Sequence, residues 1–444
     1  MSKTVRKELF SKLQTIYDLH RRIAGVIMKE DAEQLLDLLS VCQEEAISIG
    51  TRIDAVYGEG TESVKKLEEY CELLFQTSEE PEKYVLLDAW MQETEALMQE
   101  EIPDKQEVVF LPYKSSMWDS LESVWMAAQA DENCDAYVIP IPYFTKNPDG
   151  SFREEHWDGD DFPENVPVTR YDVYDFEVRR PDVIYIHNPY DDCNHVVSVH
   201  PFFYSNNLVK YTEQLIYIPY FVLGEINPDN EVAVEHVKGF IVTPVMVNAH
   251  KIIVQSENMR QLYIKLLTEV TEPEGIGREY WEEKIFGTGS PKFDKITSLD
   301  AEKVQIPEEW KKIIYKPDGS RKKIILYNTG VDAMIKKRDQ MLVKIKNVLA
   351  VMKEHQEEIV LLWRPHPMMK ATLLSVCPRL WPEYEEIVNT YRNEGWGIYD
   401  DTQDMDRAIV ISDAYYGDGS SLVQLCRKTG KPVMIQNVEI LEET

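Results

Sequence analysis

IVISDAYYGDGSSLVQL, residues 409–425, is the stretch that decides the fold. Together with Ala408, its first residues form a short, apolar, β-branched run that is typical of a buried parallel strand. A polar turn with two glycines follows, and Ser421 begins a helix with an apolar face. A strand, such a turn and a helix N-terminus make an anion site, because backbone N–H groups and the helix dipole point to the strand end. The alternative interpretation is an ordinary loop with a serine cap.

Length and composition limit the classes of protein to consider. A chain of 444 residues is long enough for two or three domains, and 43% hydrophobic residues indicate packed cores. The formal net charge of −30 argues against general nucleic-acid binding, because a polyanion would be repelled. The six cysteines are scattered without paired spacing, which favours buried thiols over a disulfide framework or a zinc site.

The sequence shows no targeting pattern. No apolar segment approaches the ~20 residues that span a bilayer, and the first residues contain no apolar signal segment. We therefore expect a cytoplasmic protein, at most peripheral at the inner face of the cell membrane.

Residues 1–103 are predicted to be entirely helical. Apolar residues recur at helical spacing in three stripes, and a fourth helix is expected over residues 84–99. A helical region of this kind favours oligomerisation or docking, so a homo-oligomer formed through these helices is one expected assembly. Peripheral membrane contact by the first helix is the alternative, although its basic residues are spread around the helix.

Beyond residue 104 strands alternate with helices, which predicts an α/β fold with parallel sheets. Residues 104–295 are expected to form a Rossmann-like acceptor domain and residues 321–444 a Rossmann-like nucleotide donor domain, joined by a linker over 296–320. The polar interval 147–181 is expected to carry a hairpin. Two doubly wound domains in series would face each other across a cleft at the carboxyl edges of their sheets. In the second domain strands are predicted at 323–327, 358–363, 397–399, 408–412 and 432–436, and helices at 333–355, 382–392 and 421–428.

Three loops follow strands of the second domain and are expected at one sheet edge: 328–330, 364–367 and 413–421. They offer a guanidinium, an imidazole, hydroxyls, backbone N–H groups and carboxylates, a set that fits a pyrophosphate. His366 would donate to a leaving oxygen, and the alternative is a structural histidine in a proline-rich turn. The carboxylates suit ribose or acceptor hydroxyls better than phosphate. The predicted donor-binding residues are Arg364, Asn328, Thr329, Asp413, Asp418, Gly419, Ser420 and Ser421.

Arg364-Pro365-His366-Pro367 and the later segment Ser412–Ser421 resemble the C-terminal half of the CDP-glycerol glycerophosphotransferase family. Its members are the teichoic-acid primases and polymerases of Gram-positive bacteria and have a GT-B fold. Their pattern is a His-Pro turn followed by a strand that ends in Ser/Thr-Asp-Tyr-Ser-Ser. Gly287–Asp294 is similar to the family's Gly-x-Pro-Arg-x-Asp segment, and Ile325–Thr329 to its Leu-Tyr-x-Pro-Thr strand end.

This resemblance implies a site and a reaction. His366, Ser420 and Ser421 would bind the pyrophosphate of a CDP-linked donor, with His366 stabilising the departing CMP. No metal and no other cofactor would be needed.

The first domain departs from the family, whose Trp-His-Gly segment carries the histidine that would act as base. The comparable strand end here is Ile218-Pro219-Tyr220-Phe221, without histidine. His187 follows an apolar strand and is the preferred substitute, with Asp191 as its orienting carboxylate. A structural histidine is the alternative interpretation, and His195 and His200 rank below His187. The predicted acceptor-binding residues are Lys114, Ser115 and His200.

Two further patterns are assigned to structure. Asp158-Gly159-Asp160-Asp161 mimics an acidic metal motif but lies in a polar insertion, so no metal site is predicted there. Trp118, Trp125 and Tyr137 are expected in the core rather than stacked on a ligand.

The leading hypothesis is a metal-independent transferase. It would move glycerol phosphate, or a related polyol phosphate, from a CDP-linked donor to a hydroxyl of a cell-wall or surface glycopolymer precursor, including a lipid-linked one. Two alternatives stay open. One is a glycosyltransferase that uses a UDP- or GDP-sugar, and the other is a catalytically silent nucleotide-binding or scaffold protein.

Overall fold

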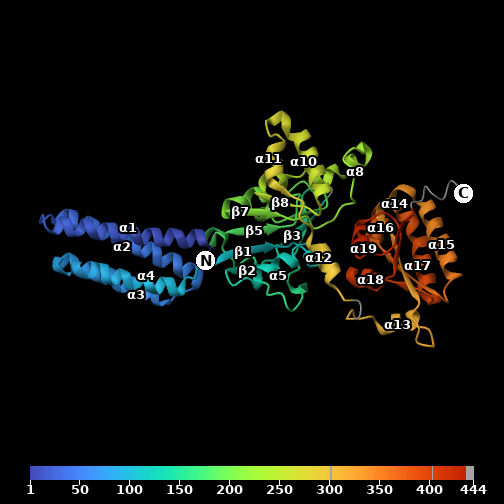
Figure 1. Ribbon diagram of the computed structural model, residues 1–444, viewed down its shortest axis with the longest axis horizontal. Helices are drawn as coiled ribbons and strands as arrows, with labels where there is room; N and C mark the ends of the chain where they lie inside the picture. The colour runs from blue at the N-terminus through green and yellow to red at the C-terminus, as the bar shows by residue number, and fades with distance from the viewer. Residues whose placement is uncertain (148, 301–302, 403, 437–444) are drawn as a thin grey trace. The chain divides into compact units, whose positions relative to one another are not determined.

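The computed structural model describes residues 1–147, 149–300, 303–402 and 404–436 (Figure 1). The chain divides into two compact units. The first comprises Met1–Ile218 and Val242–Ile252, and the second comprises Pro219–Ile241 and Ile253–Thr444.

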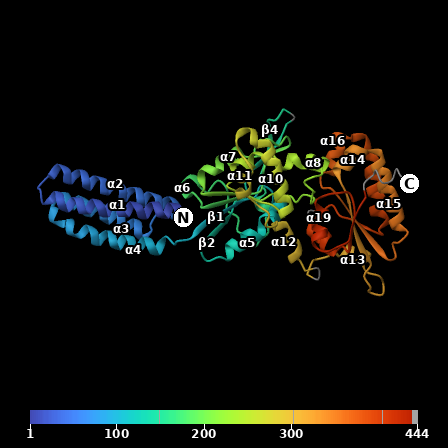
Figure 2. The ribbon, with the colours of Figure 1, turned by 45° about the horizontal axis from the view of Figure 1, so that its top comes forward.

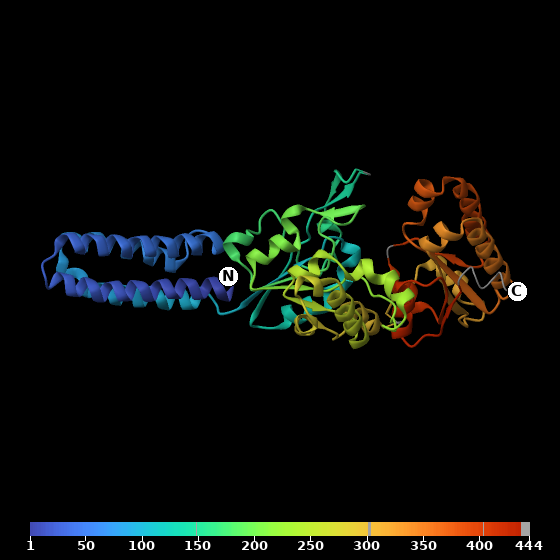
Figure 3. The ribbon, with the colours of Figure 1, turned by 90° about the horizontal axis from the view of Figure 1, so that it is seen from above.

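Four long helices form the N-terminal part of the first unit, and they lie side by side (Figure 2 and Figure 3). Their apolar faces pack into one core that extends from Met1 to Ile102, as the helical stripes predict. Side chains of Ser2, Asp31 and Thr61 cap three of the helices by accepting backbone N–H groups, which fixes where these helices begin. The helices are α1 Lys3–Ile27, α2 Ala32–Tyr57, α3 Glu62–Glu79 and α4 Leu87–Glu101, with a 3₁₀ turn over Pro81–Leu86 before α4.

A six-stranded sheet follows, with strand order β2-β1-β5-β7-β8-β9. Strands β1, β2, β5, β7 and β8 pair in parallel, and the apolar residues Val108–Leu111 of β1 are buried. The strands are β1 Gln106–Leu111, β2 Cys134–Val138, β5 Val183–Ile186, β7 Gln214–Tyr217, β8 Lys251–Ile253 and β9 Ile285–Phe286. The helices that lie between these strands along the chain are α5 Glu122–Ala130, α6 Phe176–Arg179, α7 Ser205–Leu208, α8 Glu231–Ile241, α9 Pro244–Asn248, α10 Glu257–Thr271 and α11 Arg278–Lys284.

A small antiparallel sheet of β3 Tyr143–Lys146, β4 Phe152–His156 and β6 Val197–Val199 accompanies the first sheet. The hairpin predicted within residues 147–181 is present but begins earlier, at Tyr143. Trp118 and Trp125 are buried and contact each other edge to face, which confirms their assignment to the core. All six cysteines are free thiols, but the prediction that they are buried holds only for Cys42, Cys377 and Cys426. Cys71 and Cys134 are half-buried, and Cys193 is exposed.

The second sheet is parallel and has the order β12-β11-β10-β13-β14. Figure 2 shows this sheet between helices α15 and α19. Alternate residues of its central strands enter two separate cores, one on each face of the sheet. Tyr327 and Trp363 lie in the core with α14–α17, whereas Leu326 and Leu362 lie in the core with α18 and α19. The strands are β10 Lys323–Thr329, β11 Ile359–Pro365, β12 Ile398–Tyr399, β13 Ala414–Gly417 and β14 Val433–Ile435. The helices are α12 Pro291–Ser298, α13 Glu308–Ile314, α14 Val331–Lys337, α15 Asp339–Lys353, α16 Met369–Val376, α17 Trp381–Glu394, α18 Met405–Ile411 and α19 Ser421–Lys428.

The class predicted from the sequence, α/β with two parallel sheets after a helical region, is confirmed. The strand predicted at residues 408–412 is wrong, because this run is helix α18, capped by the Asp404 carboxylate, and the strand is β13. A short, fully buried apolar run carries no periodicity that separates helix from strand. The helix predicted over 333–355 is likewise two helices, α14 and α15, which meet at Arg338 with φ +46°.

None of the helices in the described part of the chain combines the length and the apolar character that crossing a bilayer requires.

We predict that Gly417 tolerates no side chain. Its φ is +136°, and a Cβ atom would lie 2.2 Å from the carbonyl oxygen of Asn328. Gly417→Ala should therefore lower the free energy of unfolding by about 2 kcal/mol or more in urea denaturation. Gly419→Ala is the matched control, because a Cβ there would have no atom within 4 Å. Equal stability of the two variants would contradict the close approach of β13 to β10.

Candidate functional site

The carboxyl ends of β10, β11 and β13 bring three loops together. The backbone N–H of His366 donates to Thr329 O at 3.0 Å, and that of Asp418 donates to Asn328 O at 3.0 Å. The chain turns in opposite directions from β10, to β11 and β12 on one side and to β13 and β14 on the other. This is the topological switch point of the sheet, where α/β folds bind ligands.

Asp418 is tied into this edge by a buried ion pair. Its Oδ2 accepts the Gly330 N–H at 2.7 Å, and its Oδ1 accepts from Lys344 Nζ. Both side chains are buried, with Lys344 fully so. The carboxylate is thereby neutralised and occupies the N-terminus of α14, so Asp418 supports the loops rather than facing a ligand.

Three more of the predicted donor-binding residues are also committed to internal bonds. Asn328 Nδ2 donates to Arg364 O at 2.8 Å, and Thr329 Oγ1 accepts from Trp363 Nε1 at 3.2 Å. The buried Arg364 guanidinium pairs with Asp400 at 2.5 Å and donates to Thr402 O at 2.8 Å. Because Asp400 cancels its charge, we regard Arg364 as a positioning residue.

Asp413 lies at the other end of the sheet. It precedes β13, and its carboxylate accepts from Ile324 N at 2.8 Å and pairs with Arg321 and Lys323, at the start of β10. The prediction that places Asp413 after a strand is wrong, because residues 408–411 form a helix and the strand begins after Asp413.

His366 is exposed at the carboxyl end of β11. Its Nδ1 accepts the Met368 N–H at 3.1 Å, so a neutral ring carries its proton on Nε2 and can donate there. Partial loss of hydration lowers the pKa of His366 below its ordinary value, an effect that the Asp332 carboxylate opposes. The ring is therefore a neutral hydrogen-bond donor at neutral pH.

Gly419, Ser420 and Ser421 form the turn into α19. Gly419 and Ser421 are exposed, and Ser420 Oγ lies 3.4 Å from Tyr415 OH. His366 follows β11 and this turn follows β13, and β10 lies between these two strands. The ends of β11 and β13 are therefore two interstrand spacings apart, about 10 Å. An imidazole donor and a helix N-terminus thus share one edge, which suits an extended anion.

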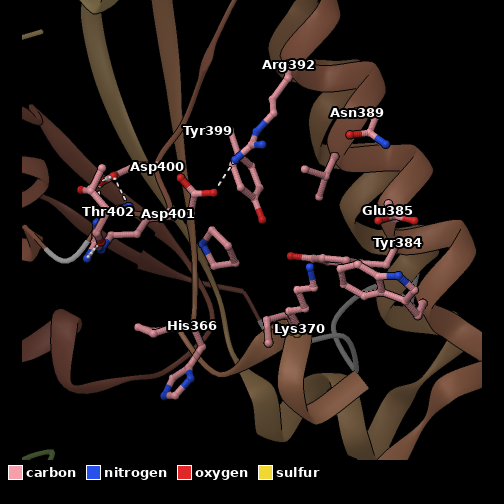
Figure 4. A pocket seen from close by; sticks show the side chains of 16 residues that line it. His366, Lys370, Tyr384, Glu385, Asn389, Arg392, Tyr399, Asp400, Asp401 and Thr402 are labelled. Atoms are coloured by element: carbon pink, nitrogen blue, oxygen red, sulfur yellow. Dashed lines mark hydrogen bonds and ion pairs between the residues drawn. The ribbon is translucent and has the colours of Figure 1, made fainter. Parts of the chain in front are cut away.

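A pocket of about 340 Å³ lies beside His366, between the ends of β11 and β12 and helices α16 and α17. In Figure 4, Lys370 and Tyr384 point toward its middle, and the His366 ring lies at its rim. Lys370 Nζ lies 5.3 Å from the Trp381 ring, and Arg392 pairs with Asp401 at 2.5 Å. The side chain of Asn389 also lines the pocket.

Neither this pocket nor the Lys344–Asp418 pair is predicted from the sequence. The spacing of Lys344 could have indicated its burial, because it lies three residues after Met341 and four before Val348 on the apolar face of α15. Asp400–Thr402 follow the short strand β12, but two residues of strand are too few to mark an edge.

The acceptor-side residues are in the first unit, and two of them are buried. His187 is fully buried, its Nε2 accepts the Tyr113 N–H at 3.0 Å, and its Nδ1 lies 2.9 Å from Ser120 Oγ. Ser120 already donates its hydroxyl proton to Met117 O, so His187 Nδ1 donates to Ser120. With both ring nitrogens engaged in the core, His187 is not placed to act as the predicted base.

Asp191 does not orient His187. Its carboxylate accepts from Ser205 N at 2.9 Å and from Ser205 Oγ at 2.7 Å, and burial raises its pKa. His200 Nδ1 accepts the Phe202 N–H at 3.2 Å and caps a 3₁₀ turn.

Lys114 and Ser115 do follow β1, as predicted. Burial lowers the pKa of Lys114, against the pull of Asp158, and the ammonium lies 5.0 Å from the Tyr143 ring. The Ser115 N–H donates to Asp158 Oδ2 at 3.3 Å. The acidic motif at 158–161 is thereby partly used in structure, and the described residues contain no cluster of three or more metal-ligating side chains.

No protein-family model and no curated protein matches the sequence. Among solved structures, S. aureus MnaA with UDP is 12% identical, with 74% of this chain and 78% of that chain covered and a TM-score of 0.44. UDP-GlcNAc 2-epimerase from Methanocaldococcus jannaschii is 10% identical, with 76% and 86% covered and a TM-score of 0.43. The wall teichoic acid polymerase TagF with CDPG is 12% identical, with 86% and 81% covered and a TM-score of 0.43. Likenesses of this size do not identify an activity.

We predict that the His366 imidazole titrates below pH 6.5 in the free protein, as followed by NMR with a His366→Ala spectrum for assignment. Adding inorganic pyrophosphate should raise this pKa, because a nearby anion favours the imidazolium. A midpoint above 6.5 in the free protein would contradict the neutral His366 ring. A midpoint that pyrophosphate leaves unchanged would contradict the anion site.

Proposed function

We propose that the chain is a transferase that moves glycerol phosphate, or a related polyol phosphate, from a CDP-linked donor to a hydroxyl of a surface glycopolymer precursor. The observation that carries the proposal is the shared edge of the second sheet, which presents the His366 Nε2 donor and the N-terminus of α19. A pocket of about 340 Å³ lies beside His366. The family motifs around His366, Ser420 and Ser421 support the same reaction.

The proposed chemistry uses hydrogen bonding rather than a protein nucleophile. The acceptor oxygen forms a bond to the donor phosphorus as the bond from that phosphorus to the CMP oxygen breaks. His366 donates to an oxygen of the departing CMP, and the α19 N-terminus with Ser420 and Ser421 holds the pyrophosphate charge. The hydroxyl proton leaves to a base that we do not assign, because His187 is engaged in the core.

The pocket beside His366 suits the nucleoside of the donor. Its rim continues from the His366 turn, and its lining provides the rings of Trp381 and Tyr399 and the amide of Asn389. Aromatic rings can stack on a base, and an amide can both donate to and accept from its edge.

A catalytically silent nucleotide-binding protein is the second candidate. The engagement of His187 and Asp191 inside the first unit favours it, because these two residues are then not available to take the acceptor proton. Such a protein would bind CDP-glycerol without releasing CMP.

The decisive variant is His366→Ala, assayed by CMP release from CDP-glycerol with glycerol 3-phosphate or a polyol-phosphate oligomer as acceptor. Loss of one donor to a developing charge should lower the rate about 100-fold. The fold should be retained, because the side chain is exposed.

His355→Ala is the matched control, since it removes another exposed imidazole, just before the start of β11. Wild-type rates in His366→Ala, or an equal loss in both variants, would overturn the proposed role. Calorimetry then separates the two candidates: tight CDP-glycerol binding without turnover by the wild-type chain supports the silent protein, and preference for UDP- or GDP-sugars contradicts the CDP donor.

A further inference from the structure

A second pocket lies in the first unit and takes no part in the proposed reaction. It has a volume of about 320 Å³ and is lined by residues 171–177 and 200–211. Seven of the nine lining side chains carry aromatic rings, and the other two are carboxylates. The lining residues are Tyr171, Tyr174, Asp175, Phe176, Glu177, His200, Phe202, Phe203 and Tyr211.

The rings form one continuous cluster. Phe202 stacks on Tyr211 with centroids 5.6 Å apart, and it meets Phe203 edge to face at 5.1 Å. Phe176 lies 5.7 Å from Phe202 and contacts Tyr174 at 4.7 Å. Phe176 and Phe203 are buried, which holds the wall in place, while Phe202 and Tyr211 are partly exposed and can meet a ligand.

The charged side chains that line the pocket have one sign. Asp175 and Glu177 are exposed, and none of the described residues lining the pocket is Lys or Arg. The guanidinium of Arg179 does lie 5.0 Å from the Tyr174 ring, but Glu107 pairs with it at 2.8 Å. A cation placed in the pocket would therefore meet aromatic rings and two carboxylates, with no Lys or Arg among the described residues that line it.

We propose that this pocket binds an organic cation of the quaternary ammonium class. The negative faces of aromatic rings attract such cations, whose methyl groups also bury well against them, and a small alkylammonium is less strongly hydrated than a metal ion. A neutral apolar ligand would gain from the rings but would gain nothing from Asp175 and Glu177.

The test uses tetramethylammonium and choline as probes and 3,3-dimethylbutanol, the uncharged carbon isostere of choline, as the comparison. Titration of the full chain is followed by NMR, where N-methyl protons that lie over ring faces shift upfield. We expect choline to bind at least about 10-fold more tightly than the isostere. Equal affinities would mean that the positive charge contributes nothing to binding, which would contradict the proposal. Absence of binding by both cations would also overturn it.

Two variants locate the binding. Phe202→Ala should remove the upfield shift and weaken binding about 10-fold or more, whereas Phe152→Ala, which changes another exposed phenylalanine, should not.

Glu177→Gln should weaken cation binding without changing isostere binding. This variant should keep its fold, because the side chain is exposed. Glu155→Gln, on β4, is its matched control. If neither Phe202→Ala nor Glu177→Gln weakens cation binding, the cation binds outside this pocket and the proposal is contradicted.

Discussion

The ion pair between Lys344 and Asp418 is the interaction on which the second sheet's ligand edge depends. Lys344 is fully buried on α15, and its ammonium contacts both the Asp418 carboxylate and the carbonyl of Gln436 after β14. The same carboxylate holds the first N–H of the β10–α14 turn. Removing one partner of such a pair leaves an uncompensated buried charge, which costs about 3–5 kcal/mol. One pair thus fixes the turn into α19, the turn into α14 and the end of β14.

This arrangement divides the polar residues of the edge into two groups. One group forms hydrogen bonds within and between the loops and to the core, and so holds the loops in position. Its members are Asn328, Thr329, Arg364 and Asp418. His366 and the turn of Gly419–Ser421 remain at the surface and can meet a ligand. A neutralised Asp418 matters here, because a free carboxylate beside the α19 N-terminus would repel a phosphate. The edge is therefore compatible with the proposed anion in spite of its aspartate.

The sequence predicts the order of most elements because their periodicity is strong. The four N-terminal helices and helix 421–428 follow from apolar spacing. The strand prediction at 408–412 is wrong because a buried apolar tetrapeptide fits a helix as well as a strand. The Asp404 cap starts a helix before this run. The strand comes later and ends at Gly417, where a side chain would clash with the backbone of Asn328. Site residues are harder still. His187 follows a strand as a catalytic base would, yet only three-dimensional packing brings Tyr113 and Ser120 to its two nitrogens.

The central claim is that the donor binds at the carboxyl edge of the second sheet. Hydrogen–deuterium exchange of the full chain with and without CDP-glycerol tests it most directly. We expect slower exchange in peptides that cover residues 365–370 and 418–424, at the His366 turn and the start of α19. Protection confined to residues 112–120 or 187–205 of the first unit, or no protection anywhere at saturating CDP-glycerol, would contradict it.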